Sequence, residues 1–558
     1  MKKILFLSLL FLLNSAVKAQ KINYKTDSLT VSELAFPEWT PTTINSDAAK
    51  VDYSKTPQVI YPEKNLVNLY KTAWEITASR TRTGADLKPG LPASPYLDEN
   101  VFEDQIWIWD SAFMTLYTRY APSTFPGLQT LENIYYPIHK QVETGLKICL
   151  RDNPPILAWA EYDNYLFSAD DKRIAHVMDK EHFLEKHFDF FQNIPKGNEQ
   201  TYASYQPVFR GVVRISPSGK FVAEDEDGYN VNYPLIGFTW SRGASGMDNT
   251  PRNPIADRDT DILWVDALSQ QAFSALCISR IYKSRGNKTK QKEWMKRYDE
   301  LKEILNKYYW DEEDGFYYDL SRKTGTFSKV KTCASYWVMM AEIPTKKQAK
   351  RMTGYLQTDS DGFSELGGKY PFLSLSRLHP LYDNETGNYW RGGIWLPFAY
   401  MTTKALEKYG YYELADELAE NLLRHILNVY VNGFEGKHTI WECYSPSQDR
   451  PSTEHGRTAR PDFCGWSALG PISMFIENVM SFHHINGVER RIEWTLKAKN
   501  GTHGIKGLNF ANITTDIIYD ADQKMVNVIS NNSYNLIING KRFNVSKGVT
   551  KIKPSVKR

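Results

Sequence analysis

Cysteine is scarce in this chain of 558 residues. Its five cysteines, Cys149, Cys277, Cys333, Cys443 and Cys464, are few and odd in number. Exported proteins that depend on disulfides carry a dense and even set of cysteines. A disulfide framework is therefore excluded as the main source of stability, and a large apolar core has to supply it.

Apolar runs long enough to cross a membrane are also missing. A spanning helix needs roughly 20 apolar residues, whereas the apolar stretch near the start runs only from Ile4 to Leu13. It follows two lysines and precedes Val17-Lys18-Ala19, which is the layout of a cleavable signal peptide over residues 1–19. We expect a soluble exported protein, periplasmic or extracellular, without membrane insertion.

Net charge is a third feature that the chain lacks. The formal charge of +3 includes the three lysines of the predicted signal peptide, which has no acidic residue, so the mature chain is neutral overall. Nucleic-acid binders show a basic excess, and proteins of membrane surfaces show a basic amphipathic helix. Neither kind of partner is expected, and the sequence leaves the oligomeric state open.

Metal and phosphate motifs are absent as well. No His/Cys spacing is typical of zinc, and no phosphate-binding glycine loop or nucleophile elbow occurs. Asp257, Asp259 and Asp261 form an acidic cluster, but it lacks the turn glycine of a calcium loop. We expect no cofactor, with calcium at this cluster as the alternative.

Amphipathic stretches with helical periodicity occupy most of the chain. Apolar residues recur at i, i+4 and i+8, as in Leu268, Ala272 and Leu276, which predicts helices packed on helices. The predicted helices are Asn65–Ser79, Ser111–Tyr120, Leu131–Leu150, Asp266–Lys283, Lys290–Tyr309, Lys346–Leu356, Trp395–Tyr409, Tyr412–Asn428 and Ser467–Phe482.

Long irregular segments separate these helices and are typical of functional loops. They are Lys88–Asp110, Lys196–Asn253, Gln357–Gly393 and Asn432–Trp466. We interpret the pattern as a mainly α chain, a barrel of helices over residues 61–488 with its site on one rim. An extended segment, 20–60, packs on the barrel, and short β-branched runs over 489–558 predict a small antiparallel β domain.

Aromatic residues are abundant where the periodic patterns stop. They make up 13% of the chain, and many stand beside glycine or carboxylates in the irregular segments. Sugar rings present flat C–H faces that pack on aromatic rings, and their hydroxyls bond to carboxylates, amides and guanidinium groups. The distribution favours a sugar-binding cleft, although an aromatic-rich core accounts for part of it.

Two carboxylates stand out in these segments. Asp248 lies in Ser245-Gly246-Met247-Asp248-Asn249, and Glu442 lies in Trp441-Glu442-Cys443-Tyr444. Cleavage of a glycosidic bond needs one protonated acid and one ionised carboxylate. We predict Asp248 as the acid, in a partly desolvated pocket beside Trp240 and Arg252. Glu442 is predicted as the base.

Each assignment has a plainer alternative. Asp248 is also explained as a turn-forming aspartate, and Glu442 as one half of a structural ion pair. If Glu442 is the base, Arg450, Arg457 and Tyr444 are candidate donors that keep it ionised.

Further candidates for binding the sugar precede two predicted helices. Asp110, in Trp107-Ile108-Trp109-Asp110, is either a helix-capping acid or an acceptor for sugar hydroxyls above a tryptophan wall. Arg391 stands among aromatics before Gly392-Gly393, where the backbone can approach a ligand. The predicted substrate-binding residues are Trp107, Trp109, Asp110, Trp240, Arg391, Trp395, Tyr444 and Trp466.

Five motifs taken in order resemble glycoside hydrolase family 63 and its trehalase-like relatives. They are 106–113, 154–160, 245–249, 389–395 and 441–444. The resemblance implies an (α/α)6 barrel that cleaves α-glycosidic bonds with inversion, with Asp248 as general acid and Glu442 as general base. It also implies that Trp109, Asp110, Arg391 and Trp395 line the pocket for the terminal sugar.

The motifs depart from that family after the predicted base. Relatives commonly show Glu-Asn-Tyr-Asn where this chain has Glu442-Cys443-Tyr444-Ser445, and the trehalase versions of the motifs are absent. We therefore expect an exo-α-glucosidase that acts on an oligosaccharide or glycoside. The alternatives are an α-mannosidase for a glycoside with an acidic aglycone, bound by Arg450, Arg457 or Arg460 unless these lie in a solvated loop, and a non-catalytic glycan-binding protein.

Overall fold

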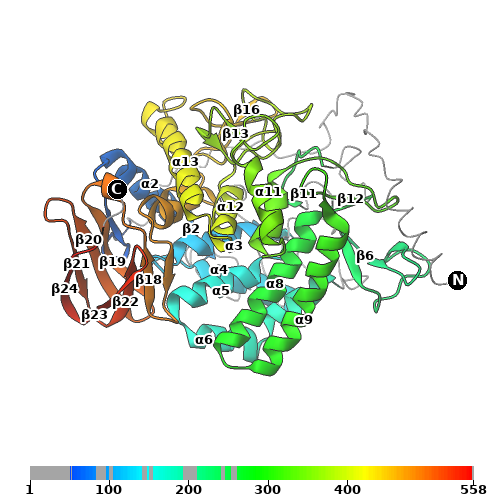
Figure 1. Ribbon diagram of the computed structural model, residues 1–558, viewed down its shortest axis with the longest axis horizontal. Helices are drawn as coiled ribbons and strands as arrows, with labels where there is room; N and C mark the ends of the chain where they lie inside the picture. Colours follow the sequence, from blue (N-terminus) through cyan, green and yellow to red (C-terminus); the bar gives the residue numbers. More distant parts are fainter. Residues whose placement is uncertain are drawn as a thin grey trace.

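The structure is a computed structural model that describes residues 51, 53–82, 96–99, 105–140, 147–149, 155–192, 210–240, 245–252 and 261–555. The predicted signal peptide, most of the predicted extended segment, and Asp257 and Asp259 lie outside these residues. Figure 1 shows helices in the middle of the molecule and the strands near the C-terminus to one side of them.

Helices form most of the described chain. The α-helices are α2 (Lys64–Ser79), α3 (Ile108–Thr118), α4 (Gly127–Lys140), α5 (Leu157–Ser168), α6 (Asp171–Ile174), α7 (Phe183–Gln192), α8 (Val265–Ser284), α9 (Lys288–Ile304), α10 (Trp337–Met340), α11 (Lys346–Tyr355), α12 (Leu396–Lys408) and α13 (Tyr412–Asn432). Segments with π-helical hydrogen bonding are η2 (Ala175–Lys180), η4 (Leu305–Tyr309) and η7 (Gly470–Val479), and short 3-10 turns are η1 (Tyr53–Lys55), η5 (Cys333–Tyr336), η6 (Ser467–Leu469) and η8 (Ala498–Asn500).

Six helical segments contact one another in a closed circle. The contacts run from α3 to α5, α8, α10, α12 and η7, and η7 packs back on α3. Every residue of α3 is buried, whereas α9, which packs on α8 from outside the circle, buries only Trp294, Tyr298 and Leu301. A single apolar stripe fits a helix with one packed side, and burial all round fits a helix with neighbours on every side.

Aromatic side chains fill the inside of this circle. Trp159 of α5 lies 5.8 Å from Phe113 of α3, 5.9 Å from Phe273 of α8, 5.7 Å from Trp337 of α10 and 6.3 Å from Tyr400 of α12, measured between ring centres. Aromatic rings bury large areas and favour such edge-to-face and stacked contacts. The circle therefore encloses a packed core instead of an open channel.

Most predicted helices are present, with ends that differ by a few residues. The prediction for Leu131–Leu150 is wrong at residues 147–149, because these form β5 (Lys147–Cys149), which pairs in parallel with β4 (Gln105–Trp107). The periodicity also fails to predict α5. That helix is buried on most of its faces and so lacks the polar stripe by which an amphipathic helix is recognised.

The segment predicted as irregular between Lys196 and Asn253 contains much of a five-stranded sheet. Its order is β12-β9-β8-β6-β7. The strands are β6 (Arg210–Ile215), β7 (Phe221–Ala223), β8 (Leu235–Trp240), β9 (Ile262–Leu263) and β12 (Leu320–Ser321). All positions of β8 are buried, so it lacks the period-two alternation that marks a half-exposed strand.

The strands near the C-terminus form two sheets. One has the order β1-β19-β20-β21-β24 and the other β17-β18-β22-β23. The strands are β1 (Gln58–Ile60), β17 (His484–Asn486), β18 (Arg491–Trp494), β19 (His503–Phe510), β20 (Ile513–Asp520), β21 (Met525–Ser530), β22 (Tyr534–Ile538), β23 (Lys541–Val545) and β24 (Gly548–Ile552).

The prediction of antiparallel pairing is wrong for one pair, because β18 and β22 are parallel. Three strands of the other sheet connect them, which allows the chain to return in the same direction. These sheets also pack on the helical part: Trp494 of β18 stacks on Phe482, and its Nε1 donates to the carbonyl of Met480 at 2.8 Å.

Two-stranded pairs complete the described structure. They are β2 (Thr81–Arg82) with β3 (Tyr96–Leu97), β10 (Trp310–Asp311) with β11 (Phe316–Tyr317), β13 (Ser364–Glu365) with β14 (Tyr370–Pro371), and β15 (Thr453–Glu454) with β16 (Arg457–Thr458). Figure 1 shows β13 and β16 at the top of the view, above α11 and α12.

Candidate active site

Glu442 is a buried residue whose carboxylate and backbone carbonyl both accept hydrogen bonds. Its Oε1 accepts hydrogen bonds from the Tyr389 hydroxyl and from Arg460 Nη1, both at 2.7 Å, and its Oε2 accepts from the Arg460 backbone N–H at 3.3 Å. Its carbonyl oxygen accepts from Trp466 Nε1 and from the Ser467 hydroxyl. Charge-assisted hydrogen bonds of this kind are short and orient the acceptor.

Tyr389 reaches Glu442 from an unusual backbone conformation. Asn388 and Tyr389 have φ values of 27° and 65°, which residues other than glycine rarely adopt. Asn249 holds this stretch, because its Oδ1 accepts from the Trp390 N–H at 2.8 Å and its Nδ2 donates to the Asn388 carbonyl at 2.9 Å. Burial, and next the charge of Glu442, raises the pKa of Tyr389 well above its usual value, so the phenol keeps its proton and donates.

Asp248 lies on the turn to which Asn249 belongs. Gly246 has a φ of 75°, and a Cβ atom placed there would lie 2.5 Å from a ring carbon of Trp109, so the backbone of the turn rests on this indole. The negative charge of Asp248 is among the groups that raise the pKa of Tyr389. Both predicted catalytic carboxylates therefore interact with the same phenol.

Arg252 anchors the far end of this turn. Its buried guanidinium donates two hydrogen bonds to Asp266, at 2.8 and 2.7 Å, and two to Asp319, at 2.8 and 2.6 Å. Its Cζ lies 4.2 Å from the ring centre of Trp264. A buried cation is costly unless it is fully paired, and here two bidentate carboxylates satisfy it. The turn that carries Asp248 is thus tied to the start of α8.

Four tryptophans form a cluster beside the two carboxylates. Trp390 and Trp395 stack with ring centres 3.9 Å apart, and Trp466 lies 5.7 Å from Trp395 and 5.8 Å from Trp109. Three of them, Trp109, Trp395 and Trp466, belong to the predicted substrate-binding set. Trp109 also lies 5.8 Å from Phe113, so the cluster continues the aromatic core of the helical circle to one of its ends.

Tyr444 and Trp240, two other predicted binding residues, have contacts typical of packing residues. The buried Tyr444 hydroxyl accepts a hydrogen bond from the Trp441 backbone N–H at 3.1 Å and so supports the segment that carries Glu442. Trp240 is buried at the end of β8, where its ring centre lies 5.9 Å from Phe191 and 6.4 Å from Trp264.

The remaining predicted binding residues lie on the segments that bound the site. Asp110 is buried in the first turn of α3, and Trp107, directly before that helix, is half-buried. Arg391 is half-buried, and its Nε donates to the carbonyl of Asn249 at 3.4 Å. Arg391 is therefore joined directly to the turn of Asp248.

The donors to Glu442 differ from those named in the sequence analysis. Arg450 instead lies over the ring of Phe434, 5.1 Å from its centre. Arg457 is exposed on β16. Arg460 does not lie in a solvated loop, because its side chain is largely buried against Glu442.

The sequence signal for these donors is weak. Tyr389 belongs to one of the five motifs, but its hydrogen bond to Glu442 is evident only from the fold. Arg460 comes beside Glu442 because Trp441 and Pro461 pair as an antiparallel bridge. No periodicity in residues 441–461 predicts that pairing.

Glu454 is a further carboxyl group at the site, and no motif in the sequence marks it. It ends β15, and its Oε2 lies 3.7 Å from Arg460 Nη2. Burial raises the pKa of Glu454 to about 7; the charge of Arg460 opposes this shift and that of Glu442 adds to it. One guanidinium thus faces two carboxyl groups.

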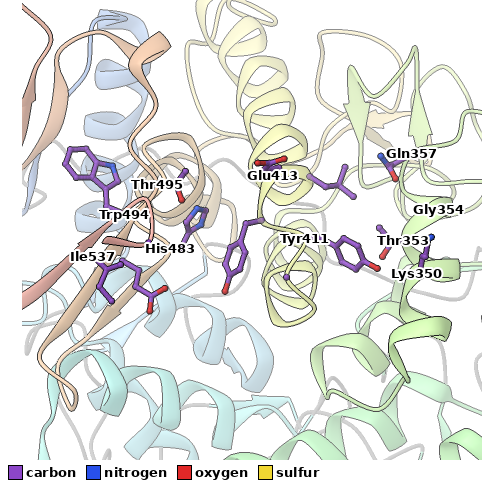
Figure 2. A pocket seen from close by; sticks show the side chains of 15 residues that line it. Lys350, Thr353, Gly354, Gln357, Tyr411, Glu413, His483, Trp494, Thr495 and Ile537 are labelled. Carbon is purple, nitrogen blue, oxygen red and sulfur yellow. The ribbon is translucent and has the colours of Figure 1, made fainter. Parts of the chain in front are cut away.

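A separate cavity of about 770 Å³ lies between the helical part and the C-terminal strands (Figure 2). It is lined by Lys350, Thr353, Gly354, Gln357, Gly410, Tyr411, Tyr412, Glu413, Leu414, His483, Glu493, Trp494, Thr495, Ile537 and Gly540. Glu413 is exposed, and Glu493 is paired with Arg491 at 3.3 Å. The buried His483 also lines the cavity, but neither of the cavity's two carboxyl groups is buried. Cleavage of a glycosidic bond needs a pair of carboxyl groups, which favours the cluster around Glu442 over this cavity.

Two other properties concern the parts of the chain that the structure describes. In these parts, no three His, Cys, Asp or Glu side chains are grouped so as to hold a metal ion. Asp261, the one described member of the predicted acidic cluster, accepts hydrogen bonds from the Ser321 hydroxyl and the Lys323 backbone N–H. In the same parts, no helix has the length and apolar character of a membrane span.

Comparison with known proteins gives several matches. An uncharacterized protein from Borreliella burgdorferi is 25% identical over 83% of this chain and 89% of its own length. A mannosylglycerate hydrolase from Rubrobacter radiotolerans is 30% identical over 22% of this chain and 27% of its own length. A solved structure named "Sialidase" superimposes with a TM-score of 0.60 at 13% identity, over 89% of this chain and 40% of that one, and shows similarity of fold alone.

A family model supplies the most specific match. Its description is "Mannosylglycerate hydrolase MGH1-like glycoside hydrolase domain", and it matches residues 139–463. The matched range is more than half of the chain and includes Asp248, Tyr389, Glu442 and Arg460. The resemblance to glycoside hydrolase family 63 is thereby confirmed. This chain belongs to the MGH1-like family of glycoside hydrolase domains.

Proposed function

We propose that the protein is an exported, inverting exo-α-glycosidase in which Asp248 is the general acid and Glu442 is the general base. The observation that carries the proposal is the placement of Glu442, a buried carboxylate oriented by Tyr389 and Arg460, with Asp248 acting on the same phenol. Inverting glycosidases use one acid and one base on opposite sides of the scissile bond.

In the proposed reaction, Asp248 gives its proton to the leaving-group oxygen as the bond from that oxygen to the anomeric carbon breaks. Glu442 takes a proton from water, whose oxygen forms the new bond at the opposite face of the anomeric carbon. Two donors occupy Oε1 of Glu442 at 2.7 Å, so Oε2, with its longer 3.3 Å contact, is the oxygen that receives the proton. Exchange with solvent then restores both carboxyl groups.

The arrangement of helices supports an (α/α)6 barrel for the catalytic part, residues 61–488. α3, α5, α8, α10, α12 and η7 would form its inner ring, and α2, α4, α7, α9 and α13 pack against these segments from outside. The proposed organisation adds a signal peptide over 1–19, an extended segment over 20–60 and a β domain over 489–558. Pairing of β1 with β19 supports packing of the extended segment on the rest of the molecule.

The substrate proposed first is a terminal α-glucoside of an oligosaccharide or glycoside. A second candidate is an α-mannoside with an acidic aglycone, which is favoured by the names of the matching family model and of the Rubrobacter radiotolerans relative. Arg460 is engaged by Glu442, so the exposed Arg457 is the better candidate for binding an acidic aglycone.

A screen of the purified protein tests the function. Aryl and natural α-glucosides, α-mannosides and α-galactosides are supplied, mannosylglycerate among them, and NMR follows the anomer of the released sugar. Release of a β-anomer from an α-glycoside is expected. Release of the α-anomer would refute inversion. Binding without release, by a protein shown to be folded, would identify a glycan-binding protein instead.

Substitution of the two carboxylates tests the residue assignments. Asp248→Asn and Glu442→Gln are expected to lower kcat by about 10²- to 10⁴-fold, because each removes one proton-transfer group. Glu413→Gln, at an exposed position in the separate cavity, is the matched control and should keep the kcat of the wild type. Turnover near the wild-type rate in either folded site variant would rule that residue out.

A further inference from the structure

Arg460 lies between two carboxyl groups, and the proposed reaction uses only one of them. Its Nη1 is 2.7 Å from Glu442 Oε1, and its Nη2 is 3.7 Å from Glu454 Oε2. The exposed fractions of the side chains are 12% for Arg460, 2% for Glu442 and 20% for Glu454. The guanidinium therefore connects a fully buried carboxylate with one that solvent reaches.

The backbone fixes Glu454 relative to Glu442. The Glu442 N–H donates to the carbonyl of Arg460 at 2.9 Å, and the Ser452 N–H donates to the carbonyl of Cys443 at 3.0 Å. These bonds attach both ends of the β15–β16 hairpin to the segment that carries the proposed base. The distance from Glu454 to Arg460 is thus set by strand pairing and does not depend on a free loop.

The charged groups that face Glu454 are Arg460, Glu442 and Arg457, its partner across the hairpin. Glu454 also interacts with Tyr389, because its charge is among those that raise the pKa of this phenol. When Glu454 is protonated, Arg460 has one anionic partner, Glu442. When Glu454 is ionised, two anions compete for the same guanidinium.

We propose that Glu454 is a positioning residue of the hydrolysis: its protonated form leaves Arg460 on Glu442, and its ionised form draws Arg460 away and lowers the rate. This inference rests on the proposed function, since it assumes that Glu442 is the base. Glu454 itself touches no reacting atom. It acts through the guanidinium that orients the base, so its effect depends on pH.

The pH profile of Glu454→Gln tests the inference, because the neutral amide imitates the protonated acid. Below pH 6 we expect its kcat to stay within about twofold of wild type. One pH unit above the Glu454 pKa, the wild type should lose about tenfold more activity than the variant, since only about a tenth of Glu454 is then protonated. Glu454→Asp keeps a titrating carboxyl group and should retain the alkaline loss, whereas Glu413→Gln should follow the wild type throughout.

Two results would overturn the inference. One is an alkaline limb of Glu454→Gln that coincides with that of the wild type. The other is an equal loss at every pH, which would indicate a structural role only.

A wild type that releases no sugar defeats the proposed function, and the coupling of Glu454 to Arg460 is then tested separately, without turnover. The ¹⁵N shift of Arg460 Nε, identified by its loss in Arg460→Lys, should titrate near pH 7 in the wild type and stay constant in Glu454→Gln. A shift that stays constant in both proteins would refute it.

Discussion

Tyr389 donates to Glu442 at 2.7 Å, while its ring packs edge-on against Trp395 at 4.6 Å. Tyr389→Phe keeps the ring and removes the donor. A hydrogen bond to a charged group contributes about 1.5–3 kcal/mol, so we expect kcat to fall about 10- to 100-fold in steady-state kinetics. The control, Tyr298→Phe, removes a buried hydroxyl that donates to two backbone carbonyls, and it should lower Tm without changing kcat. An unchanged kcat in Tyr389→Phe would contradict the role of the phenol.

Glu454 predicts a pH dependence of stability as well as of rate. Its pKa is raised from 4.5 to about 7 in the folded protein, chiefly by burial. The folded state therefore binds this proton more tightly than the unfolded chain does. The resulting stabilisation is complete below about pH 4.5 and is lost as the pH rises to about 7, by at most about 3 kcal/mol.

The measurement compares urea unfolding of the wild type and Glu454→Gln across this window. The free energy of unfolding of the wild type, minus that of the variant, should decrease from pH 4.5 to pH 7. A difference that stays constant over the window would contradict the raised pKa.

At the scale of elements, the turn that carries Asp248 depends on the absence of a side chain at Gly246. Gly246→Ala has to place a methyl group 2.5 Å from the Trp109 ring, at a φ of 75°. Gly286→Ala has the same φ of 75°, with no heavy atom within 4 Å of the new methyl group. Both variants should lose about 1 kcal/mol from backbone strain, but only Gly246→Ala should also lose kcat, because its turn has to move. Equal kinetics in the two variants would show that the contact with Trp109 is unimportant.

Elements with one packed face are predicted well, and so is the largely buried α8, whose apolar residues keep the i, i+4 spacing. α9 and α11 have a clear apolar stripe, and their predicted ranges differ from the observed ones only near the ends. α5 and β8 are buried on most sides, so neither shows the period that identifies a helix or a strand. Periodicity reports a contrast between core and solvent, so an element such as α5 or β8, in which neither that contrast nor a regular apolar spacing is present, is not identified.

In the candidate site, some residues can be identified from the sequence, and other contacts are evident only in the structure. Asp248 and Glu442 are candidates from the sequence alone, because each carboxylate stands in a segment rich in glycine or aromatic residues. The pairing of Glu442 with Arg460 depends on an antiparallel bridge between Trp441 and Pro461. The role of Tyr389 depends on its left-handed φ and on the hydrogen bonds of Asn249. Both are consequences of tertiary structure.

At the scale of the whole molecule, the C-terminal sheets and the helices share one interface. Trp494 bonds to the carbonyl of Met480, Lys497 pairs with Asp416 at 2.7 Å, and β1, which precedes the helices, lies in the sheet of β19. We expect a single cooperative unfolding transition by calorimetry, with equal calorimetric and van't Hoff enthalpies. Two resolved transitions would show that the β part and the helical part unfold independently.

The closed circle of helices has a consequence for the order in which the chain folds. α3 packs on η7, and β1 pairs with β19, so segments from opposite ends of the described chain complete both the helical core and one sheet. Contacts so distant in sequence cost loop entropy before they stabilise anything, and they slow folding. A growing chain keeps the apolar faces of α3 and α5 without their final partners until residues 470–510 are available. The helical circle and the sheet of β19 therefore cannot be completed until most of the chain has been synthesised.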